Sequence, residues 1–166
     1  MGKREFEKVP SPFEGVGHMV KPEWIDHNGH MNVAFYLTAF DEAIGEFFKF
    51  LGLTNEYRKN NNVATFCGDF HIRYVRELFE GTRLKITCQL IYCDEKRIQI
   101  CQSMYNRDEG YLAAQSEVIY LHVDKSIRGV APMKWQLFDR MKAVLEAHSS
   151  LPKPENQGRV IGKSKK

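Results

Sequence analysis

The stretch DHNGHMNVAFY, from Asp26 to Tyr36, concentrates titratable and hydrogen-bonding side chains at the entry to an apolar run. Asp26 lies just before the expected start of a helix, where free backbone N–H groups and the positive end of the helix dipole gather. Two interpretations follow. Asp26 caps the helix, or it attacks a carbonyl carbon, directly or through a water molecule, while the helix N-terminus stabilises the oxyanion.

The other polar residues of the stretch each have a structural interpretation beside a chemical one. His27 and His30 have a three-residue spacing found in metal sites, but no further His or Cys cluster supports one, and we expect no metal. His30 and Asn32 are expected to hydrogen-bond the loop backbone, and His30 is also a candidate acid or base. Gly29 is expected to supply a backbone angle that other residues resist.

The element that follows is predicted to be a long helix that positions these residues. With Asn32 as N-cap and Gly52 as a C-terminal glycine stop, it runs from about Val33 to Leu51. Its phenylalanines spread beyond a single stripe, so we expect the helix to be central and covered on most sides. The apolar stripe recurs at three- and four-residue steps, at Leu37, Phe40, Ile44, Phe47, Phe48 and Leu51.

The remainder of the chain is predicted to be mainly strands. A short strand is expected in GHMVKPEW and a loop in TNEYRKNNN, before four long strands of alternating pattern joined by short turns into an antiparallel meander. The four strands are VATFCGDFHIRYV, LKITCQLIYC, RIQICQSMY and YLAAQSEVIYLHVD. A C-terminal helix follows Pro132. The predicted fold class is α+β, an antiparallel sheet wrapped around a long central helix, plus the C-terminal helix.

Length and composition favour one domain with two loose ends. Residues 1–15 are expected to be a flexible lead-in, residues 16–148 a single domain, and residues 149–166 a basic, disordered tail. The exposed edge of such a sheet favours pairing of two copies.

Charge and cysteine usage exclude several function classes. The formal net charge of +3 is concentrated after Ser149, so the nearly neutral body argues against a nucleic-acid surface. No apolar run of about eighteen residues predicts a membrane span. The four cysteines form no C-x-x-C pair and no apolar leader opens the sequence, which favours a cytoplasmic location.

The polar stretch and the order of elements resemble a known enzyme family. D-x-x-G-H-x-N-x-x-x-Y, present as Asp26, Gly29, His30, Asn32 and Tyr36, resembles the signature of hotdog-fold acyl-CoA thioesterases of the 4-hydroxybenzoyl-CoA thioesterase type. The likeness covers roughly residues 16–132. Within the family, PEWIDHNGHM, FHIR, DEKR and LHVD are most similar to betainyl-CoA thioesterase modules associated with carnitine breakdown.

The resemblance implies roles for the residues of the motif. Asp26 matches the catalytic acid, as a nucleophile that forms a mixed anhydride or as a general base toward water. The backbone amide of Val33 matches the group that polarises the thioester carbonyl. Gly29, His30 and Asn32 would shape the turn, and Tyr36 would pack and orient the loop beside the substrate.

The resemblance also implies a substrate-binding wall from a second copy of the chain. Cys67, Asp69, His71 and Arg73 are expected to share one face of the first long strand, with Asp69 as a second pocket acid that suits a trimethylammonium acyl group. For the coenzyme A phosphates the basic candidates are Lys96, Arg97 and Arg128.

The expected activity is hydrolysis of an acyl-CoA thioester to a free acid and coenzyme A. No cofactor is expected, because coenzyme A is part of the substrate, and the expected partner is the protein itself, as a homodimer or a dimer of dimers. Two alternatives stay open. The first is a hotdog enoyl-CoA hydratase or dehydratase that uses His30 to move a proton, and the second is a non-catalytic acyl-CoA-binding protein.

Overall fold

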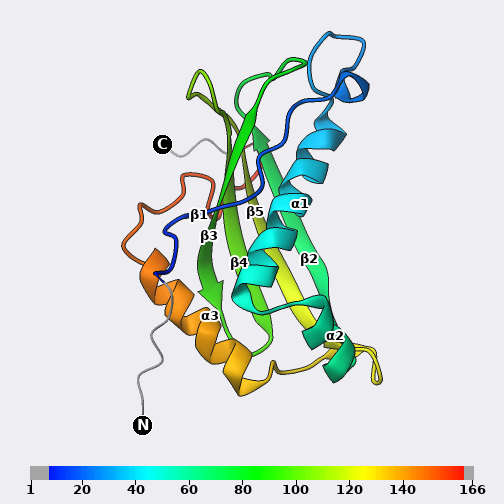
Figure 1. The fold of residues 1–166 in the computed structure, drawn as a ribbon, viewed down its shortest axis with the longest axis vertical. Coiled ribbons are helices and arrows are strands. Elements are labelled where there is room, and N and C mark those ends of the chain that lie inside the picture. The colour runs from blue at the N-terminus through cyan, green and yellow to red at the C-terminus, as the bar shows by residue number, and fades with distance from the viewer. Residues whose placement is uncertain (1–7, 163–166) are drawn as a thin grey trace.

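The computed structural model describes residues 8–162, which form an antiparallel sheet with one long helix across one of its faces (Figure 1). The helix is α1 (Val33–Leu51), and α3 (Trp135–His148) packs beside it near the edge of the sheet. A one-turn 3-10 helix, η1 (Pro22–Trp24), precedes α1, and α2 (Asn55–Asn61) follows it. This arrangement confirms the predicted hotdog architecture.

The ends of α1 agree with the prediction. Asn32 is the N-cap, and its Oδ1 accepts a hydrogen bond of 3.0 Å from the Ala34 amide. Gly52 ends the helix in the left-handed region, with φ of 98°, where glycine is favoured. The side chains of Phe40, Ile44 and Phe47 are fully buried against the sheet, so α1 is the central element of the core.

The described residues form a six-stranded sheet in the order β1-β3-β4-β5-β2, with β6 paired to β5. The strands are β1 (Phe13–Glu14), β2 (Val63–Tyr74), β3 (Leu84–Cys93), β4 (Arg97–Asn106), β5 (Leu112–Asp124) and β6 (Gly129–Val130). The four long strands were predicted, and β3, β4 and β5 form the expected meander. The predicted place of β2 in that meander, beside β3, was wrong, because this strand pairs with β5 at the edge of the sheet.

Two local predictions were wrong. The expected strand in GHMVKPEW is a single bridge between Met19 and Arg83 followed by η1, and the first strand instead lies in the lead-in, at Phe13–Glu14. The expected loop after α1 contains α2, capped by Thr54, whose side chain accepts a hydrogen bond from the Tyr57 amide. Residues 1–7 of the lead-in lie outside the described residues.

A β-bulge at Gly68 changes which face each residue of β2 occupies. Cys67 pairs with Tyr120, but the next paired residue is Asp69, opposite Ile119, so Gly68 is left out of the register. Directly opposed residues of antiparallel strands point to the same face. Tyr120 belongs to the core cluster under α1, so Cys67 faces α1 whereas Asp69 faces the other side of the sheet.

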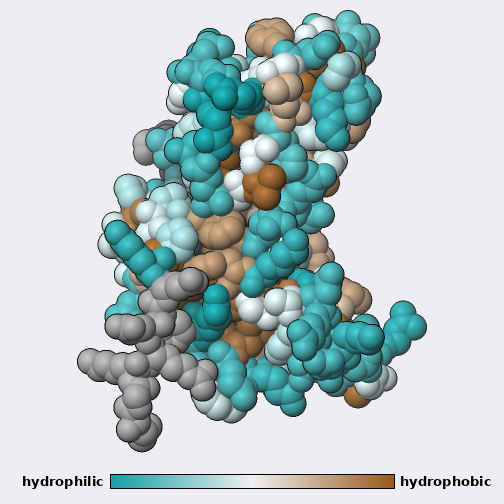
Figure 2. All heavy atoms as spheres, viewed as in Figure 1, coloured by the Kyte–Doolittle hydropathy of each residue, from teal (hydrophilic) through white to brown (hydrophobic). Residues whose placement is uncertain are grey.

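We call the face of the sheet under α1 the inner face and the opposite one the outer face. Figure 2 shows a band of hydrophobic atoms between α1 and α3, bordered by hydrophilic ones. Aromatic side chains close the core in this region, where the Phe13 ring lies 5.0 Å from that of Phe47 and 5.3 Å from that of Phe50. The short strand β1 is therefore part of the core.

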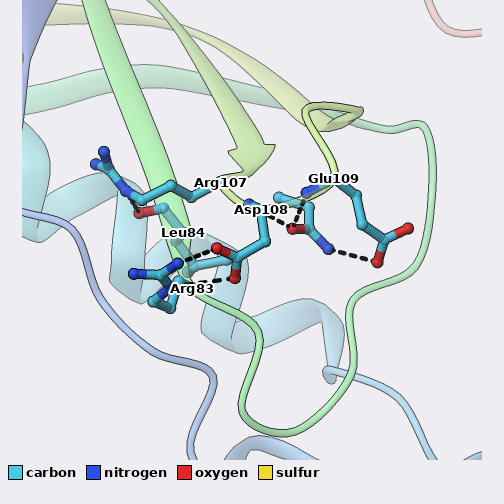
Figure 3. Close-up of polar contacts among 6 residues, drawn as sticks. Arg83, Leu84, Arg107, Asp108 and Glu109 are labelled. Atoms are coloured by element: carbon cyan, nitrogen blue, oxygen red, sulfur yellow. Dashed lines mark hydrogen bonds and ion pairs between the residues drawn. The ribbon is translucent and has the colours of Figure 1, made fainter.

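Polar contacts fix the turn between β4 and β5 to the start of β3 (Figure 3). Arg83 forms an ion pair with Asp108, and the Arg107 guanidinium donates a hydrogen bond of 3.4 Å to the Leu84 carbonyl. Asn106 accepts hydrogen bonds of 3.0 Å from the amides of Asp108 and Glu109, which closes the turn. These contacts anchor the segment that leads from β2 to β3 beside the polar stretch.

The C-terminal segment after α3 lies on the outer face of the sheet, up to the last described residue, Gly162. The Gly158 amide donates a hydrogen bond of 2.7 Å to Glu117 Oε2, Glu155 lies 3.6 Å from Arg73, and Asn156 is fully buried. These contacts differ from the expectation of a disordered tail from Ser149 onward. Residues 163–166 of that tail lie outside the described residues.

Candidate active site

Asp26 lies in a tight loop that enters α1. Ile25 and Met31 form an antiparallel bridge, and the Asp26 amide donates a hydrogen bond of 3.1 Å to the His30 carbonyl. Within this loop Asp26 Oδ1 accepts a hydrogen bond of 2.8 Å from the Asn28 amide. No other hydrogen bond to the carboxylate joins it to a described residue, so Oδ2 is available to a substrate. Asp26 is therefore a half-buried carboxylate held in place by its own turn.

Gly29 makes this turn possible. Its φ of +82° lies in the left-handed region, as predicted for a position that other residues resist. The Gly29 amide donates a hydrogen bond of 3.0 Å back to the Asp26 carbonyl. Gly29 has an exposed backbone and shapes the loop.

The first turn of α1 supplies amide groups beside this loop. Val33 is the first helical residue, and among residues 8–162 its N–H forms no hydrogen bond, as expected for a group at a helix N-terminus. The Asn32 amide donates to the Trp24 carbonyl at 2.8 Å, which ties the start of α1 to η1. Val33 is 59% exposed, and its amide is the free donor at the start of α1 that a ligand oxygen could take.

His30 and Tyr36 have different surroundings. His30 is half-exposed, and its Nε2 lies 3.9 Å from Glu77 Oε2, in the segment that joins β2 to β3. Tyr36 is buried and its ring packs edge-on against Tyr74 at 5.1 Å. Burial raises the pKa of Tyr36 to about 12, although a hydrogen bond from the Leu78 amide acts in the opposite direction. Tyr36 therefore packs the first turns of α1 against the end of β2 and the segment that follows it.

Tyr74 was not predicted as part of this site. Its hydroxyl donates a hydrogen bond of 3.2 Å to the Val33 carbonyl, so it joins the end of β2 to the first turn of α1. Its side chain is 48% exposed and lies next to the free amide. The sequence feature that could have identified Tyr74 is its position at the end of the alternating pattern of β2, on the same face as Phe70 and Ile72.

The three basic candidates lie at the other end of the sheet from Asp26. Lys96 and Arg97 lie at the turn from β3 to β4, and Arg128 lies between β5 and β6, whereas the Asp26 loop adjoins the opposite ends of β2 and β3. Lys96 and Arg128 are exposed. One chain therefore does not bring these residues to the Asp26 carboxylate.

Arg97 is already engaged by an acid. Its Nε lies 2.7 Å from Asp94 Oδ2, and its Nη2 lies 2.6 Å from the same oxygen. Burial acts to raise the pKa of Asp94, but hydrogen bonds from Arg97 and from the Lys96 amide lower it to about 2. An arginine held in this way has less of its charge available for a phosphate, so Lys96 and Arg128 are the better candidates.

Asp69 was expected to share a face with Cys67, and this was wrong because of the bulge at Gly68. Asp69 lines a cavity of about 660 Å³ on the outer face, together with His71, Glu117 and residues of the C-terminal segment. The Asp26 loop and α1 lie on the inner face. Within one chain, Asp69 and Asp26 are thus on opposite sides of the sheet.

The four cysteines lie on β2, β3 and β4 and have free thiols. Burial raises the pKa of the Cys88 and Cys101 thiols to about 12, which makes both poor nucleophiles. In the described part of the chain, no three His, Cys, Asp or Glu side chains gather to hold a metal ion. Every helix between residues 8 and 162 is too short or too polar to span a bilayer.

A half-buried carboxylate and a free helix N-terminal amide at the two ends of one short loop are suited to attack on a carbonyl group. The sequence of residues 20–147 matches the family model described as the thioesterase-like superfamily. The chain belongs to this superfamily. It is accordingly a thioester hydrolase, and the sequence-based assignment to hotdog-fold thioesterases is confirmed.

Two curated relatives carry a more specific name. A betainyl-CoA thioesterase of Pseudomonas aeruginosa is 37% identical over 143 residues, which are 86% of this chain and 90% of the relative. An L-carnitine dehydrogenase/betainyl-CoA thioesterase of a Rhizobium species is 29% identical over 88% of this chain. The chain spans only 29% of the length of that larger protein.

Solved structures share the fold over almost the whole chain. A Staphylococcus aureus protein, SAV2348, in complex with CoA, has a TM-score of 0.87 and 23% identity, covering 96% of this chain and all of its own. A putative thioesterase of Pseudomonas putida KT2440 has a TM-score of 0.79 and 27% identity, with 93% of this chain and 98% of the other covered. The first of these likenesses shows the fold alone.

Proposed function

We propose that this protein is an acyl-CoA thioesterase in which Asp26 and the Val33 amide act on the same thioester carbonyl. The observation that carries the proposal is their placement at the two ends of a loop closed by the Ile25–Met31 bridge. The name of the relative from Pseudomonas aeruginosa supports betainyl-CoA as a substrate, which would be cleaved to betaine and coenzyme A.

Asp26 has two possible roles in this reaction. As a nucleophile, its carboxylate attacks the acyl carbon, the coenzyme A thiolate leaves, and water hydrolyses the mixed anhydride that results. As a general base, it takes a proton from the water that attacks. In both routes the carbonyl oxygen gains negative charge, and the Val33 amide together with the helix dipole stabilises that charge.

We further propose that a second copy of the chain completes the site through β2. Among the described strands, β2 pairs only with β5, and it presents Phe66 at 56% exposure. A two-fold axis across this edge would pair two β2 strands antiparallel. It would then bring the Lys96 and Arg128 end of one copy toward the Asp26 end of the other, where the coenzyme A phosphates would need them.

The decisive test replaces Asp26 by Asn and measures thiol release from a panel of short, cationic, aromatic and long-chain acyl-CoAs. The exchange removes the charge and keeps the size, so kcat should fall by about 10²–10⁴-fold while circular dichroism and coenzyme A binding stay unchanged. Asp139→Asn, on the exposed side of α3, is the matched control and should retain wild-type rates. Activity of Asp26→Asn within about threefold of wild type, below about 0.7 kcal/mol, would refute the role of Asp26.

A mixing experiment tests the shared site. Asp26→Asn and Arg128→Ala proteins are each expected to be impaired, but a mixed dimer contains one site with both groups intact. Subunit exchange should therefore give more thiol release, at low acyl-CoA concentration, than the sum of the two separate proteins. A monomer by light scattering, or strictly additive activity, would contradict the shared site.

A further inference from the structure

Two of the three acids on the exposed side of α1 form ion pairs. Glu42 Oε2 lies 2.8 Å from His18 Nε2, and Glu46 Oε1 lies 2.7 Å from the Lys49 ammonium group. Asp41 lies beside Glu42, is exposed, and takes part in none of the ion pairs between described residues. Of these three acids, Asp41 is thus the one without an ion-pair partner among the described residues.

Asp41 faces the edge strand of the sheet. It lies seven residues before Phe48, on nearly the same side of the helix, and the Phe48 ring packs edge-on against Tyr120 at 4.9 Å. Tyr120 pairs with Cys67 across the strands. Burial raises the pKa of Tyr120, and the neighbouring Asp41 carboxylate raises it further, consistent with a hydrogen bond between the two side chains.

Between Asp41 and the candidate catalytic groups the surface is apolar and aromatic. Leu37 lies one turn before Asp41 and is 45% exposed, and Val33 and Tyr74 follow at the N-terminal end of the helix. The distance from Val33 to Asp41 is eight residues, or about 12 Å along the axis of α1. We call these residues, with the exposed Cys67, the α1–β2 surface, and the buried Tyr120 lies beneath it.

We propose that the α1–β2 surface receives the acyl group and that Asp41 selects acyl groups with a quaternary ammonium head. A carboxylate that lacks an ion-pair partner attracts a bulky cation without N–H donors, while the exposed Leu37 and Val33 contact the methylene part of the acyl group. The inference rests on the proposed thioesterase activity. It assigns to Asp41 the role that the sequence suggested for Asp69.

Two pairs of acyl-CoAs that differ only in charge provide the test. Betainyl-CoA is compared with 3,3-dimethylbutanoyl-CoA, in which carbon replaces the ammonium nitrogen, and 4-trimethylammoniobutanoyl-CoA with 5,5-dimethylhexanoyl-CoA. The measured quantity is the ratio of kcat/KM for the cation to that for its neutral isostere. Wild type should favour the cation in both pairs, more strongly in the longer one, whose head reaches further toward Asp41.

Asp41→Asn should lower the cation-to-neutral ratio of kcat/KM by about tenfold in the longer pair, because only the attraction for the cation is removed. The value of kcat/KM for the neutral acyl-CoAs should stay unchanged. Asp41→Glu should restore much of the ratio, and Glu42→Gln, the adjacent acid on the same helix, should leave it at the wild-type value. A ratio that stays within twofold in Asp41→Asn for both pairs would overturn the inference.

The outcome can be separated from failure of the proposed function. If wild type released no thiol from any acyl-CoA, the thioesterase assignment would fail, and the role of Asp41 would be decided by binding. Uncleavable thioether analogues of the same four compounds would then be titrated by calorimetry into wild type and Asp41→Asn. Equal preference of both proteins for the cationic analogue would overturn the inference in that case too.

Discussion

The two faces of the sheet are covered by different kinds of contact. On the inner face, α1 buries large apolar side chains such as Phe40 and Phe47 completely. On the outer face, the C-terminal segment is attached by a hydrogen bond from Gly158 to Glu117 and by an ion pair of 3.6 Å between Arg73 and Glu155. The inner cover is hydrophobic and continuous, so we expect it to determine global stability, whereas the outer cover should open locally.

The largest effect should come from the inner face. Phe47→Ala removes a fully buried ring that packs on Phe13 and Phe50, and it should lower the free energy of unfolding by about 3–5 kcal/mol. Urea unfolding followed by circular dichroism measures this change. A loss below about 1 kcal/mol would show that α1 does not dominate the stability of the fold.

A smaller, pH-dependent effect is expected where the inner core closes against α3. His148 Nδ1 accepts a hydrogen bond of 2.9 Å from the Leu90 amide, and Nε2 donates one of 2.9 Å to the Pro10 carbonyl. Burial lowers the pKa of His148 in the folded protein, so protonation favours unfolding. Its contribution to stability is complete above the unfolded pKa of about 6.5 and is lost as the pH falls below that value.

Urea midpoints at pH 7.5 and pH 5.5 test this dependence. His148→Gln should cost about 1–3 kcal/mol at pH 7.5 and should show a weaker loss of stability on acidification than wild type. If wild type and His148→Gln lost stability equally between pH 7.5 and pH 5.5, His148 would not be a source of the pH dependence.

The smallest effect should come from the outer face. Deletion of residues 151–166 removes the Gly158 and Glu155 contacts, and we expect the free energy of unfolding to change by less than about 1 kcal/mol. Cys101, which is 3% exposed, pairs with Glu117, the residue that accepts the Gly158 amide, so loss of the segment should nevertheless make its thiol react faster with a thiol reagent. A cooperative loss of several kcal/mol would instead make the segment part of the core.

The parts predicted correctly are those whose signals are local. The bounds of α1, its Asn32 cap and its Gly52 stop follow from helical spacing and end chemistry within one segment. The strand β3 follows from strict alternation, with Leu84, Ile86 and Cys88 buried. The left-handed backbone of Gly29 and the Asn32 cap were predicted correctly for the same reason, because a turn and a cap involve neighbouring residues.

The parts that could not be predicted depend on contacts distant in sequence. The pairing of β2 with β5 is decided by the whole sheet, and the pattern of β2 alone does not contain it. The bulge at Gly68 could not be counted without its partner strand, so Asp69 was placed on the face that Cys67 occupies. Asp41 was overlooked because an acid on the exposed side of a helix is ordinary until the strand beside it is known.

The bulge also suggests how thioesterases of this architecture diverge. A single inserted or deleted residue in an edge strand reverses the orientation of every side chain on one side of it, and an edge strand tolerates such a change better than a central one. A substrate pocket can therefore gain or lose an acid without any point substitution among its residues. A gap near Gly68 in an alignment of relatives would therefore indicate that the side chains on one side of the gap have changed from one face of the sheet to the other.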